Sequence, residues 1–386
     1  MSAGPGAAPR RVRSVYVHAP FCARRCVYCD FAVAVRKTGD LPAWIEALTG
    51  ELAHVDREGL VRLADRLETV YVGGGTPSLL GPSAMFELAD VLGSDRLADP
   101  SLEWTAEANP ESLTAEVAEG WRSAGVNRVS LGAQSFDPAA LRWMGRLHGS
   151  EGPQSAVQVA RAAGIDNLSV DLIFGLPAHI GRSWADDLRR LVGLGVPHVS
   201  LYGLTVEAGT ALGRAVREGR ETPVDEDQYR DEFLMAADVL TRAGYVHYEV
   251  SNFARPGFES RHNSMYWRGR PYLGLGNGAH SFASPVRRWN LRSWEEYRAA
   301  VAADSSPESE RETLDETARA LEAIWLGLRT NRGLEEPATG TARADLLSTW
   351  IEGGLACASD GRFTLTTEGW LLLDRLVIDY DEAGPG

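Results

Sequence analysis

Three cysteines lie within eight residues of this 386-residue chain, in the stretch Cys22-Ala-Arg-Arg-Cys26-Val-Tyr-Cys29. One loop with this spacing can bring three thiolates to one metal centre. Structural zinc usually takes four protein ligands, often from paired Cys-x-x-Cys units, and the chain has no second pair. Three thiolates on a [4Fe-4S] cube leave one iron free for a small molecule, which favours such a cluster. Zinc completed by His18 or Asp30 is the alternative.

Further residues that could take part in binding or catalysis lie where strands are predicted to end. Gly73-Gly74-Gly75 lacks Cβ atoms, so that main-chain groups there can approach a ligand and hydrogen-bond it. Glu107 and Asp171 can accept hydrogen bonds from an ammonium group or from hydroxyls, and Arg146 can pair with a carboxylate. Each charged side chain could equally form a salt bridge at the mouth of a barrel, so these residues indicate a site only as a group.

The segments that must position these residues repeat one unit. A glycine that can end a helix, a short link and a β-rich run recur in residues 124–131, 163–170 and 194–201, with a looser copy at 243–250. Strands are predicted earlier at 14–18, 67–72 and 102–107, and helices at 42–55 and 82–92. At least six alternating units favour an α/β fold with a parallel sheet that forms a partial (βα)6, TIM-like barrel. The active face should then lie at the carboxyl ends of the strands.

From about residue 307 the pattern changes to helices. Helices are predicted at 315–328, 342–353 and 367–376, and a hairpin at 357–366 with Asp360-Gly361 as its turn. This order is typical of a mainly helical, winged-helix-like domain, so we divide the chain into residues 1–300 and 301–386. The absence of a basic cluster on these helices favours an interaction or lid module over DNA binding. We expect Cys357 to be a buried small apolar residue.

Composition and charge exclude several classes of function. Apolar residues make up 44% of the chain and charged residues 24%, which is typical of a folded globular protein. The formal net charge of −14 disfavours nucleic acid and anionic lipid surfaces as partners. No apolar run reaches the roughly 18 residues of a membrane span, and residues 1–13 hold no apolar targeting segment. We therefore expect a cytoplasmic protein. The abundance of arginine is not evidence of function, because 38 arginines against one lysine, Lys37, indicate a bias of the coding sequence.

Longer motifs around these residues resemble a known superfamily. Cys-x3-Cys-x2-Cys with Tyr28 between the last two cysteines is similar to the cluster motif of the radical S-adenosylmethionine (radical SAM) superfamily. The resemblance covers essentially the whole chain, through motifs at residues 16–21, 73–78, 107–110, 127–136 and 171–177. This set resembles the branch that contains oxygen-independent coproporphyrinogen III oxidase and the HemW-type heme chaperones.

The resemblance implies a radical SAM barrel whose [4Fe-4S] cluster is held by Cys22, Cys26 and Cys29. It also implies an S-adenosylmethionine site beside the cluster, formed by Tyr16, Tyr28, Gly74, Gly75, Thr76, Glu107, Gln134, Arg146 and Asp171. In this superfamily a reduced cluster passes one electron to the sulfonium and cleaves the cofactor to methionine and a 5′-deoxyadenosyl radical. A one-electron reductant is therefore an expected partner.

Two functions within this branch stay open. The decarboxylating oxidases typically carry a fourth cysteine two residues after the third, where this chain has Phe31, and a long extension before the first strand, where only thirteen residues precede Ser14. The sequence His262-Asn-x-x-Tyr266-Trp267 resembles instead the heme-binding signature of the chaperones. A neutral imidazole can ligate heme iron, and aromatic rings offer flat apolar surface to a porphyrin.

The resemblance favours a heme chaperone that passes heme to an acceptor protein, with coproporphyrinogen III oxidase as the alternative. Decarboxylation of coproporphyrinogen is expected to be absent or negligible. We expect His262 to be an axial heme ligand on an accessible surface, with Tyr266 and Trp267 shaping the porphyrin contact. His247 and His280 are fallback ligands.

Overall fold

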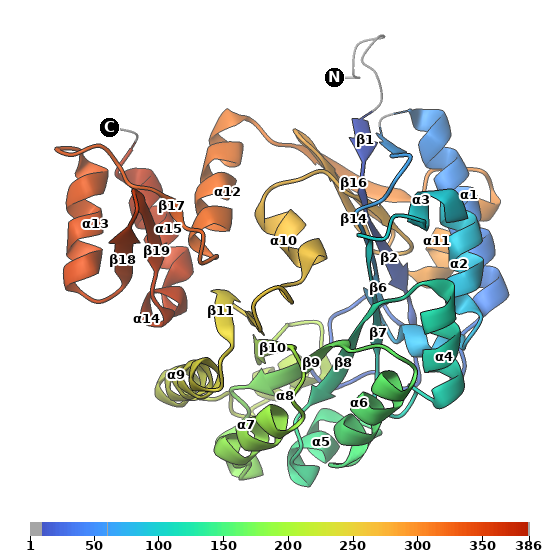
Figure 1. The fold of residues 1–386 in the computed structure, drawn as a ribbon, viewed down its shortest axis with the longest axis horizontal. Coiled ribbons are helices and arrows are strands. Elements are labelled where there is room, and N and C mark those ends of the chain that lie inside the picture. The colour runs from blue at the N-terminus through green and yellow to red at the C-terminus, as the bar shows by residue number, and fades with distance from the viewer. Residues whose placement is uncertain (1–9, 60, 385–386) are drawn as a thin grey trace.

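A large mixed sheet organises the computed structural model, which describes residues 10–59 and 61–384 (Figure 1). Within these residues, seven of its strands pair in parallel, and six of them lie in the spatial order β10-β9-β8-β7-β6-β2. They are β2 (Ser14–Ala19), β6 (Thr69–Gly74), β7 (Glu103–Ala108), β8 (Arg128–Gln134), β9 (Asn167–Phe174) and β10 (His198–Gly203). At one edge β13 (Leu273–Leu275) pairs parallel with β2. At the other edge β12 (Asn252–Ala254) and β11 (Val246–Glu249) pair antiparallel.

Helices connect the successive parallel strands and cover the outer face of the sheet, in the sweep from blue to green in Figure 1. The longer ones are α1 (Leu41–Glu58), α2 (Ala84–Leu92), α4 (Ala115–Ala124), α6 (Gly152–Ala162), α7 (Trp184–Gly193) and α9 (Glu226–Arg242). Short helices accompany them: α3 (Ser94–Leu97), α5 (Pro138–Met144) and α8 (Ala211–Arg217). Because β11 and β13 lie at opposite edges, the sheet is open. The predicted α/β fold with six βα units is confirmed.

The repeated glycine unit acts as predicted. Gly125, Gly164 and Gly195 have φ angles of 113°, 81° and 60°, a backbone conformation that ends a helix and that glycine adopts without steric cost. Strands β8, β9 and β10 follow them directly. The looser copy at residues 243–250 leads into β11, which is an edge strand and pairs antiparallel with β12.

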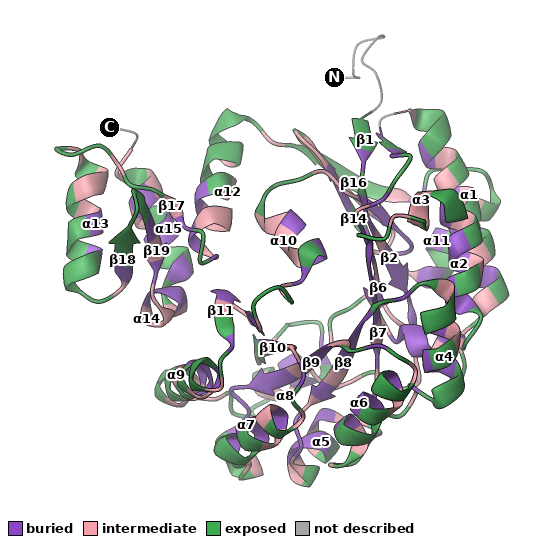
Figure 2. Cartoon of the chain, viewed as in Figure 1, coloured by how far each residue is buried: buried purple, intermediate pink, exposed green. Residues whose placement is uncertain are grey.

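The core lies between the sheet and its helices (Figure 2). Val15 and Val17 of β2 and Val70 and Val72 of β6 are all fully buried. Parallel strands that are buried on both faces must be apolar along most of their length. Polar side chains are therefore concentrated at the carboxyl ends of these strands, where a cavity opens.

The short helix α10 (Arg261–Trp267) lies between β12 and β13. After β13 the chain forms a second sheet, which joins β14 (His280–Ala283), β15 (Val286–Asn290) and β16 (Glu308–Thr313), and the helix α11 (Trp294–Ala302) connects β15 to β16. The division predicted between residues 300 and 301 falls inside α11, and β16 pairs with β15 across it. The division into two domains stays a prediction, since strands on both sides of that point share one sheet.

The C-terminal segment packs its helices on a small antiparallel sheet of order β17-β19-β18. Its elements are α12 (Glu316–Leu328), β17 (Leu334–Glu335), α13 (Ala342–Glu352), β18 (Ala356–Ser359), β19 (Arg362–Leu365), α14 (Thr367–Leu371) and α15 (Leu373–Glu382). The predicted Asp360-Gly361 turn is present, with φ angles of 54° and 74°. Two predicted details were wrong. The helix predicted at residues 367–376 is broken at Leu372. Cys357 is exposed, because β18 is an edge strand of which only the first residue, Ala356, is buried.

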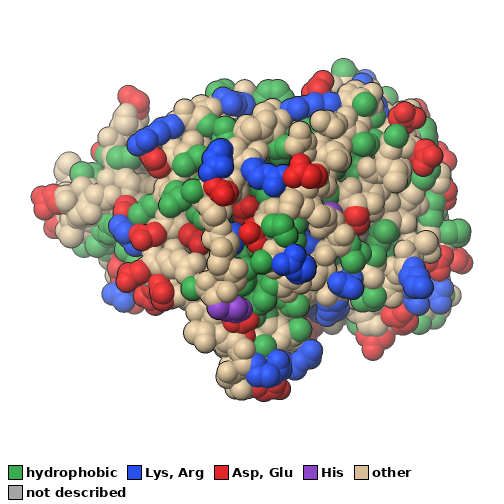
Figure 3. Space-filling model, turned by 90° about the horizontal axis from the view of Figure 1, so that it is seen from below, with side chains coloured by type: hydrophobic (Ala, Val, Ile, Leu, Met, Phe, Trp, Pro, Cys, Tyr) green, Lys and Arg blue, Asp and Glu red, His purple; other side chains and the backbone are tan. Residues whose placement is uncertain are grey.

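No helix among the described residues is both long and apolar enough to cross a membrane. The predicted lack of a targeting segment concerns residues 1–13, of which residues 1–9 lie outside the described part. On the face shown in Figure 3, acidic and basic side chains lie interspersed rather than in separate fields.

Candidate functional site

A cavity of about 990 Å³ opens at the carboxyl ends of the parallel strands. It brings together most of the residues that the sequence singled out, although they come from many separate elements. These are Tyr16, Cys22, Cys26, Tyr28, Cys29, Gly74, Gly75, Thr76, Glu107, Gln134, Arg146, Asp171 and Tyr266. His262 and Trp267 do not line it. We call this space the barrel cavity.

The three cysteines lie on a loop that is anchored at several points. The short strands β3 (Phe21–Cys22) and β4 (Ala34–Val35) pair in parallel and bracket it. Inside the loop, Val27 N donates to Met144 O at 3.3 Å, and Val27 O accepts from Leu212 N at 2.8 Å. Because Met144 ends α5 and Leu212 lies in α8, the barrel itself fixes the position of the thiols.

Burial favours the neutral thiol form of two of the cysteines. Burial raises the pKa of Cys22 to about 11, and burial also raises the pKa of Cys29. Bound iron would lower these pKa values, because the ligand form of cysteine is the thiolate. Among the described residues, no three His, Cys, Asp or Glu side chains converge as for a single metal ion. A [4Fe-4S] cube binds each thiolate to a different iron, so the three sulfur atoms need not meet at one point.

The glycine run at the end of β6 is required by the protein's own packing. A Cβ atom on Gly74 would lie 2.3 Å from the ring of His18, and one on Gly75 would lie 2.7 Å from the carbonyl oxygens of Ala19 and Phe21. The prediction that these residues lack Cβ atoms for the sake of a ligand was therefore incomplete. They let β6 pass close to the start of the cysteine loop, where Gly75 N and Thr76 N donate to Ala19 O and Phe21 O, each at 2.7 Å.

Glu107 is held at the end of β7 by two donors. Tyr71 OH donates to Glu107 Oε1 at 2.7 Å, and Gly74 N donates to Oε2 at 3.0 Å. Burial raises the pKa of Glu107 to about 7, against the effect of these hydrogen bonds. A carboxylate in such surroundings gains from a cationic ligand, which would offset its lost hydration.

Asp171 lies on β9, two strands away from Glu107 on β7. Ser130 Oγ donates to Asp171 Oδ1 at 3.1 Å, and burial raises the pKa of this carboxyl. Glu107 and Asp171 thus present two carboxyl groups on one wall of the barrel cavity. Both can accept hydrogen bonds from an ammonium group or from hydroxyls of a bound molecule.

Arg146 connects the carboxyl ends of β7 and β8 to the cysteine loop. Its Nη1 donates to Cys26 Sγ at 3.7 Å, and its Nη2 donates to Asn109 Oδ1 at 2.6 Å. Gln134 follows a bulge in β8 and has a φ angle of 67°, which is rare outside glycine and typical of functional positions. The cavity therefore carries positive charge near the thiols and carboxyl groups on the neighbouring strands.

The helix α10 places His262, Tyr266 and Trp267 differently from the prediction. His262 is buried, with its Nδ1 2.8 Å from Thr69 Oγ1 and its Nε2 2.8 Å from Tyr266 OH. The expectation of an accessible imidazole was wrong for this conformation, because hydroxyl groups occupy both ring nitrogens. Tyr266 faces the barrel cavity, while Trp267 lines a second cavity and lies under the guanidinium of Arg329 at 4.0 Å.

The fallback histidines also differ in their surroundings. His247 is packed between Phe253 and Trp370, with ring centroids 3.8 and 4.3 Å away. His280 is exposed at the mouth of the barrel cavity, where it stacks on Trp289 at 5.4 Å.

Sequence reasoning missed two residues that organise the site. Asn109 bridges Arg146 and Thr76, to which its Nδ2 donates at 3.2 Å. Its place in the motif at residues 107–110 was the signal that could have identified it. Tyr71 supports Glu107 and stacks on His262 at a centroid distance of 5.2 Å. It lies in the middle of β6, so nothing in its spacing distinguishes it from a core residue.

Comparison with known proteins agrees with this geometry. The model of the radical SAM superfamily matches residues 16–191, which include the cysteine loop and the strands up to β9. The heme chaperone HemW of Mycobacterium tuberculosis is 37% identical to this chain over 382 residues, which cover 97% of the chain and 96% of the relative.

The chain belongs to the HemW family.

HemW of Lactococcus lactis is 35% identical over 325 residues, which are 84% of this chain and 83% of that protein. HemW of Escherichia coli is 37% identical over 271 residues, 69% of each chain. The solved structure of coproporphyrinogen III oxidase (HemN) from Escherichia coli superimposes with a TM-score of 0.80, at 22% identity, over 97% of this chain and 91% of that one. HemN thus shares the fold described here.

Proposed function

We propose that this protein is a heme chaperone: it binds heme, transfers it to an acceptor protein and carries a [4Fe-4S] cluster and S-adenosylmethionine. The observation that carries the proposal is the 37% identity with a heme chaperone along 97% of the chain. The acceptor and a one-electron reductant are its expected protein partners, and the cytoplasm is its expected location.

The residues of the barrel cavity suit both resident cofactors. Cys22, Cys26 and Cys29 offer three soft sulfur donors on one anchored loop, and a [4Fe-4S] cluster takes such donors. Glu107 and Asp171 offer acceptors for the ammonium and hydroxyl groups of S-adenosylmethionine. When bound, the two groups supply one-electron reductive chemistry. The chain's own residues position them and keep water away from them.

For heme, His262 remains the proposed axial ligand. Burial lowers the pKa of His262 to about 3, so the imidazole is neutral, as an iron ligand must be. Ligation requires one hydroxyl to leave the imidazole: Tyr266 at Nε2, on the side of the barrel cavity, or Thr69 at Nδ1, on the side of the second cavity. Because Tyr266 lies one helical turn from His262 and faces the barrel cavity, rotation of its side chain would expose Nε2.

Heme titration of three single variants, followed by the Soret band, tests this assignment. His262→Ala should shift the Soret maximum and weaken heme binding, whereas His280→Ala and His247→Ala should leave both unchanged. A shift in His280→Ala alone would instead assign the ligand to the exposed histidine at the cavity mouth. Retained iron and sulfide content in each variant shows that the barrel is intact.

Coproporphyrinogen III oxidation is the alternative, favoured by the fold shared with HemN. Phe31, at the position of the oxidases' additional cysteine, has 61% of its surface exposed at the rim of the barrel cavity. We propose that this activity is absent or negligible. Incubation of the reconstituted protein with coproporphyrinogen III, S-adenosylmethionine and dithionite should give no protoporphyrinogen, and repeated turnover would overturn the chaperone assignment.

A further inference from the structure

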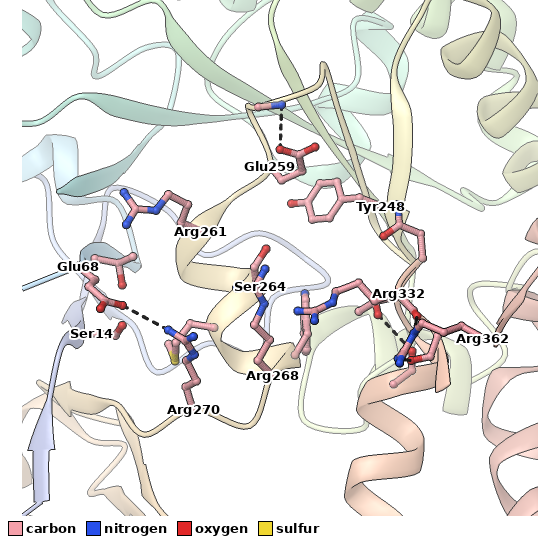
Figure 4. Close-up of a pocket in the computed structure, with 18 residues that line it drawn as sticks. Ser14, Glu68, Tyr248, Glu259, Arg261, Ser264, Arg268, Arg270, Arg332 and Arg362 are labelled. Carbon is pink, nitrogen blue, oxygen red and sulfur yellow. Dashed lines mark hydrogen bonds and ion pairs between the residues drawn. The ribbon is translucent and has the colours of Figure 1, made fainter. Parts of the chain in front are cut away.

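A second cavity of about 590 Å³ lies on the other side of α10, between this helix and the C-terminal segment (Figure 4). Its volume is within the range of about 300–1,000 Å³ that is usual for small-molecule sites. The walls come from the starts of β2 and β6, from α10 and the residues after it, and from the turns that flank β17 and β19. We call it the arginine cavity.

Five arginines line this cavity against two glutamates, in a chain whose net charge is −14. They are Arg261, Arg268, Arg270, Arg332 and Arg362. Figure 4 shows those of α10 and its following residues on one side and Arg332 and Arg362 on the other. This local excess of positive charge predicts an anionic ligand.

The glutamates do not neutralise the centre of this group. Glu68 pairs with Arg13 at 2.9 Å and with Arg270 at 3.5 Å, and Glu259 accepts from Gly257 N at 3.0 Å. Among the described residues, neither Arg268 nor Arg332 has a carboxylate within salt-bridge distance. Burial lowers the pKa of Arg268, and the nearby charges of Arg332 and Arg270 add to this effect. Two cations from distant parts of the chain are thus held near each other without a partner.

The arginine cavity also has apolar walls. Trp267, Met265 and Tyr248 line it beside the arginines. A ligand that suits both parts has a flat apolar body and more than one anionic group. A heme or other porphyrin with two propionate side chains has this chemistry.

The arginine cavity lies next to the proposed heme ligand, His262. Thr69, whose hydroxyl lies 2.8 Å from His262 Nδ1, is part of its wall. Trp267, predicted to contact the porphyrin, lines this cavity rather than the barrel cavity. A porphyrin here would lie on the Nδ1 side of His262, and ligation from this side would require the Thr69 hydroxyl to leave Nδ1.

We propose that the arginine cavity binds the propionate groups of the heme cargo, with Arg268 and Arg332 as the principal partners. The inference rests on the proposed heme-chaperone function and adds the site that selects a dicarboxylate porphyrin. It also assigns a role to the C-terminal segment, because Arg332 and Arg362 close one side of the site.

The test compares heme with heme dimethyl ester, in which both carboxylates are esterified. The wild-type holoprotein should bind heme more tightly than the ester. Arg268→Ala and Arg332→Ala should each weaken heme binding about fivefold, as expected for a partly exposed ion pair, and leave the affinity for the ester unchanged. The double variant should lose most of the preference for heme over the ester, and Arg268→Lys should retain part of this preference. Arg242→Ala is the matched control, since Arg242 is an exposed arginine of α9 that pairs with Asp238.

The outcomes separate this inference from the function on which it rests. If the wild-type protein binds neither ligand, the chaperone function and the inference both fail. If it binds both ligands equally, or if the arginine variants keep the preference for the free acid, heme binding stands and the inference is wrong. Equal losses for both ligands in Arg268→Ala would also overturn it, because they would indicate a structural effect.

Discussion

The barrel cavity and the arginine cavity lie on either side of α10 but hold their polar groups in different ways. In the barrel cavity, Glu107 is fixed by Tyr71 and Gly74, and Arg146 by Asn109. In the arginine cavity, Arg268 and Arg332 are exposed, and their side chains are free to reorganise. Fixed groups bind a resident cofactor with little loss of conformational entropy, whereas exposed groups form contacts that break easily. The difference suits a protein that keeps one set of ligands and releases another.

Removal of one cysteine should have the largest effect on the barrel cavity and none on the arginine cavity. Cys26→Ser should lose nearly all iron and acid-labile sulfide after anaerobic reconstitution, because two thiolates on the loop cannot hold the cube. Heme affinity should be unchanged, since α10 lies outside the cysteine loop. Cys357→Ser, which alters an exposed cysteine of β18, is the control and should keep its iron. One zinc per chain without sulfide would contradict the cluster assignment.

Asp171→Ala should weaken S-adenosylmethionine binding by about two orders of magnitude, because a buried acceptor is lost from the centre of the barrel cavity. Isothermal titration calorimetry on the reconstituted protein measures the affinity for S-adenosylmethionine. Heme binding should not change. Wild-type cofactor affinity with an intact cluster would show that Asp171 does not contact the cofactor.

The pH dependence of S-adenosylmethionine binding is a further test of the barrel cavity. Because burial raises the pKa of Glu107 to about 7, its carboxyl is mostly protonated below pH 6 and ionised above pH 8. Only the ionised form pairs with an ammonium group, so the affinity for S-adenosylmethionine should rise by about tenfold as the pH increases through 7. Glu107→Gln should remove this rise. A rise that persists in the variant would assign it to another group.

Gly75→Ala should lower the free energy of unfolding by about 1–3 kcal/mol, because the added methyl group meets two backbone carbonyl oxygens that cannot move independently. Gly149→Ala is the control, since a Cβ atom there meets no atom within 4 Å. Chemical denaturation of both variants measures the difference. Equal stability would mean that β6 and the cysteine loop can separate without cost.

The sequence predicted the barrel cavity well because its residues follow a periodic rule. Each βα unit delivers one or two polar residues to the same edge of the sheet, so Glu107 and Asp171 could be placed together without knowing any contact. The glycines were identified for the wrong reason, since the atoms that exclude a Cβ belong to His18 and to the backbone of residues 19–21. Such close approaches arise from tertiary packing and leave no periodic pattern.

The surroundings of α10 were predicted less well. Residues four apart on a helix share a face, so His262 meets Tyr266, while Trp267 lies about 100° further round and faces the other cavity. The motif alone suggested that all three residues served one surface. The arginine cavity was missed altogether, because Arg268, Arg332 and Arg362 meet only when the C-terminal segment packs beside α10. The many arginines of the chain also concealed any signal from these three.

The anchoring of the cysteine loop sets an order of events during synthesis. Val27 bonds to Met144 in α5 and to Leu212 in α8, which emerge from the ribosome long after the cysteines do. Contacts between such distant segments form late, because the intervening chain must first lose its conformational entropy. The middle of the loop, at Val27, therefore lacks these two bonds until the chain has been made beyond Leu212. The loop reaches its final conformation only when the parallel strands of the sheet have been synthesised.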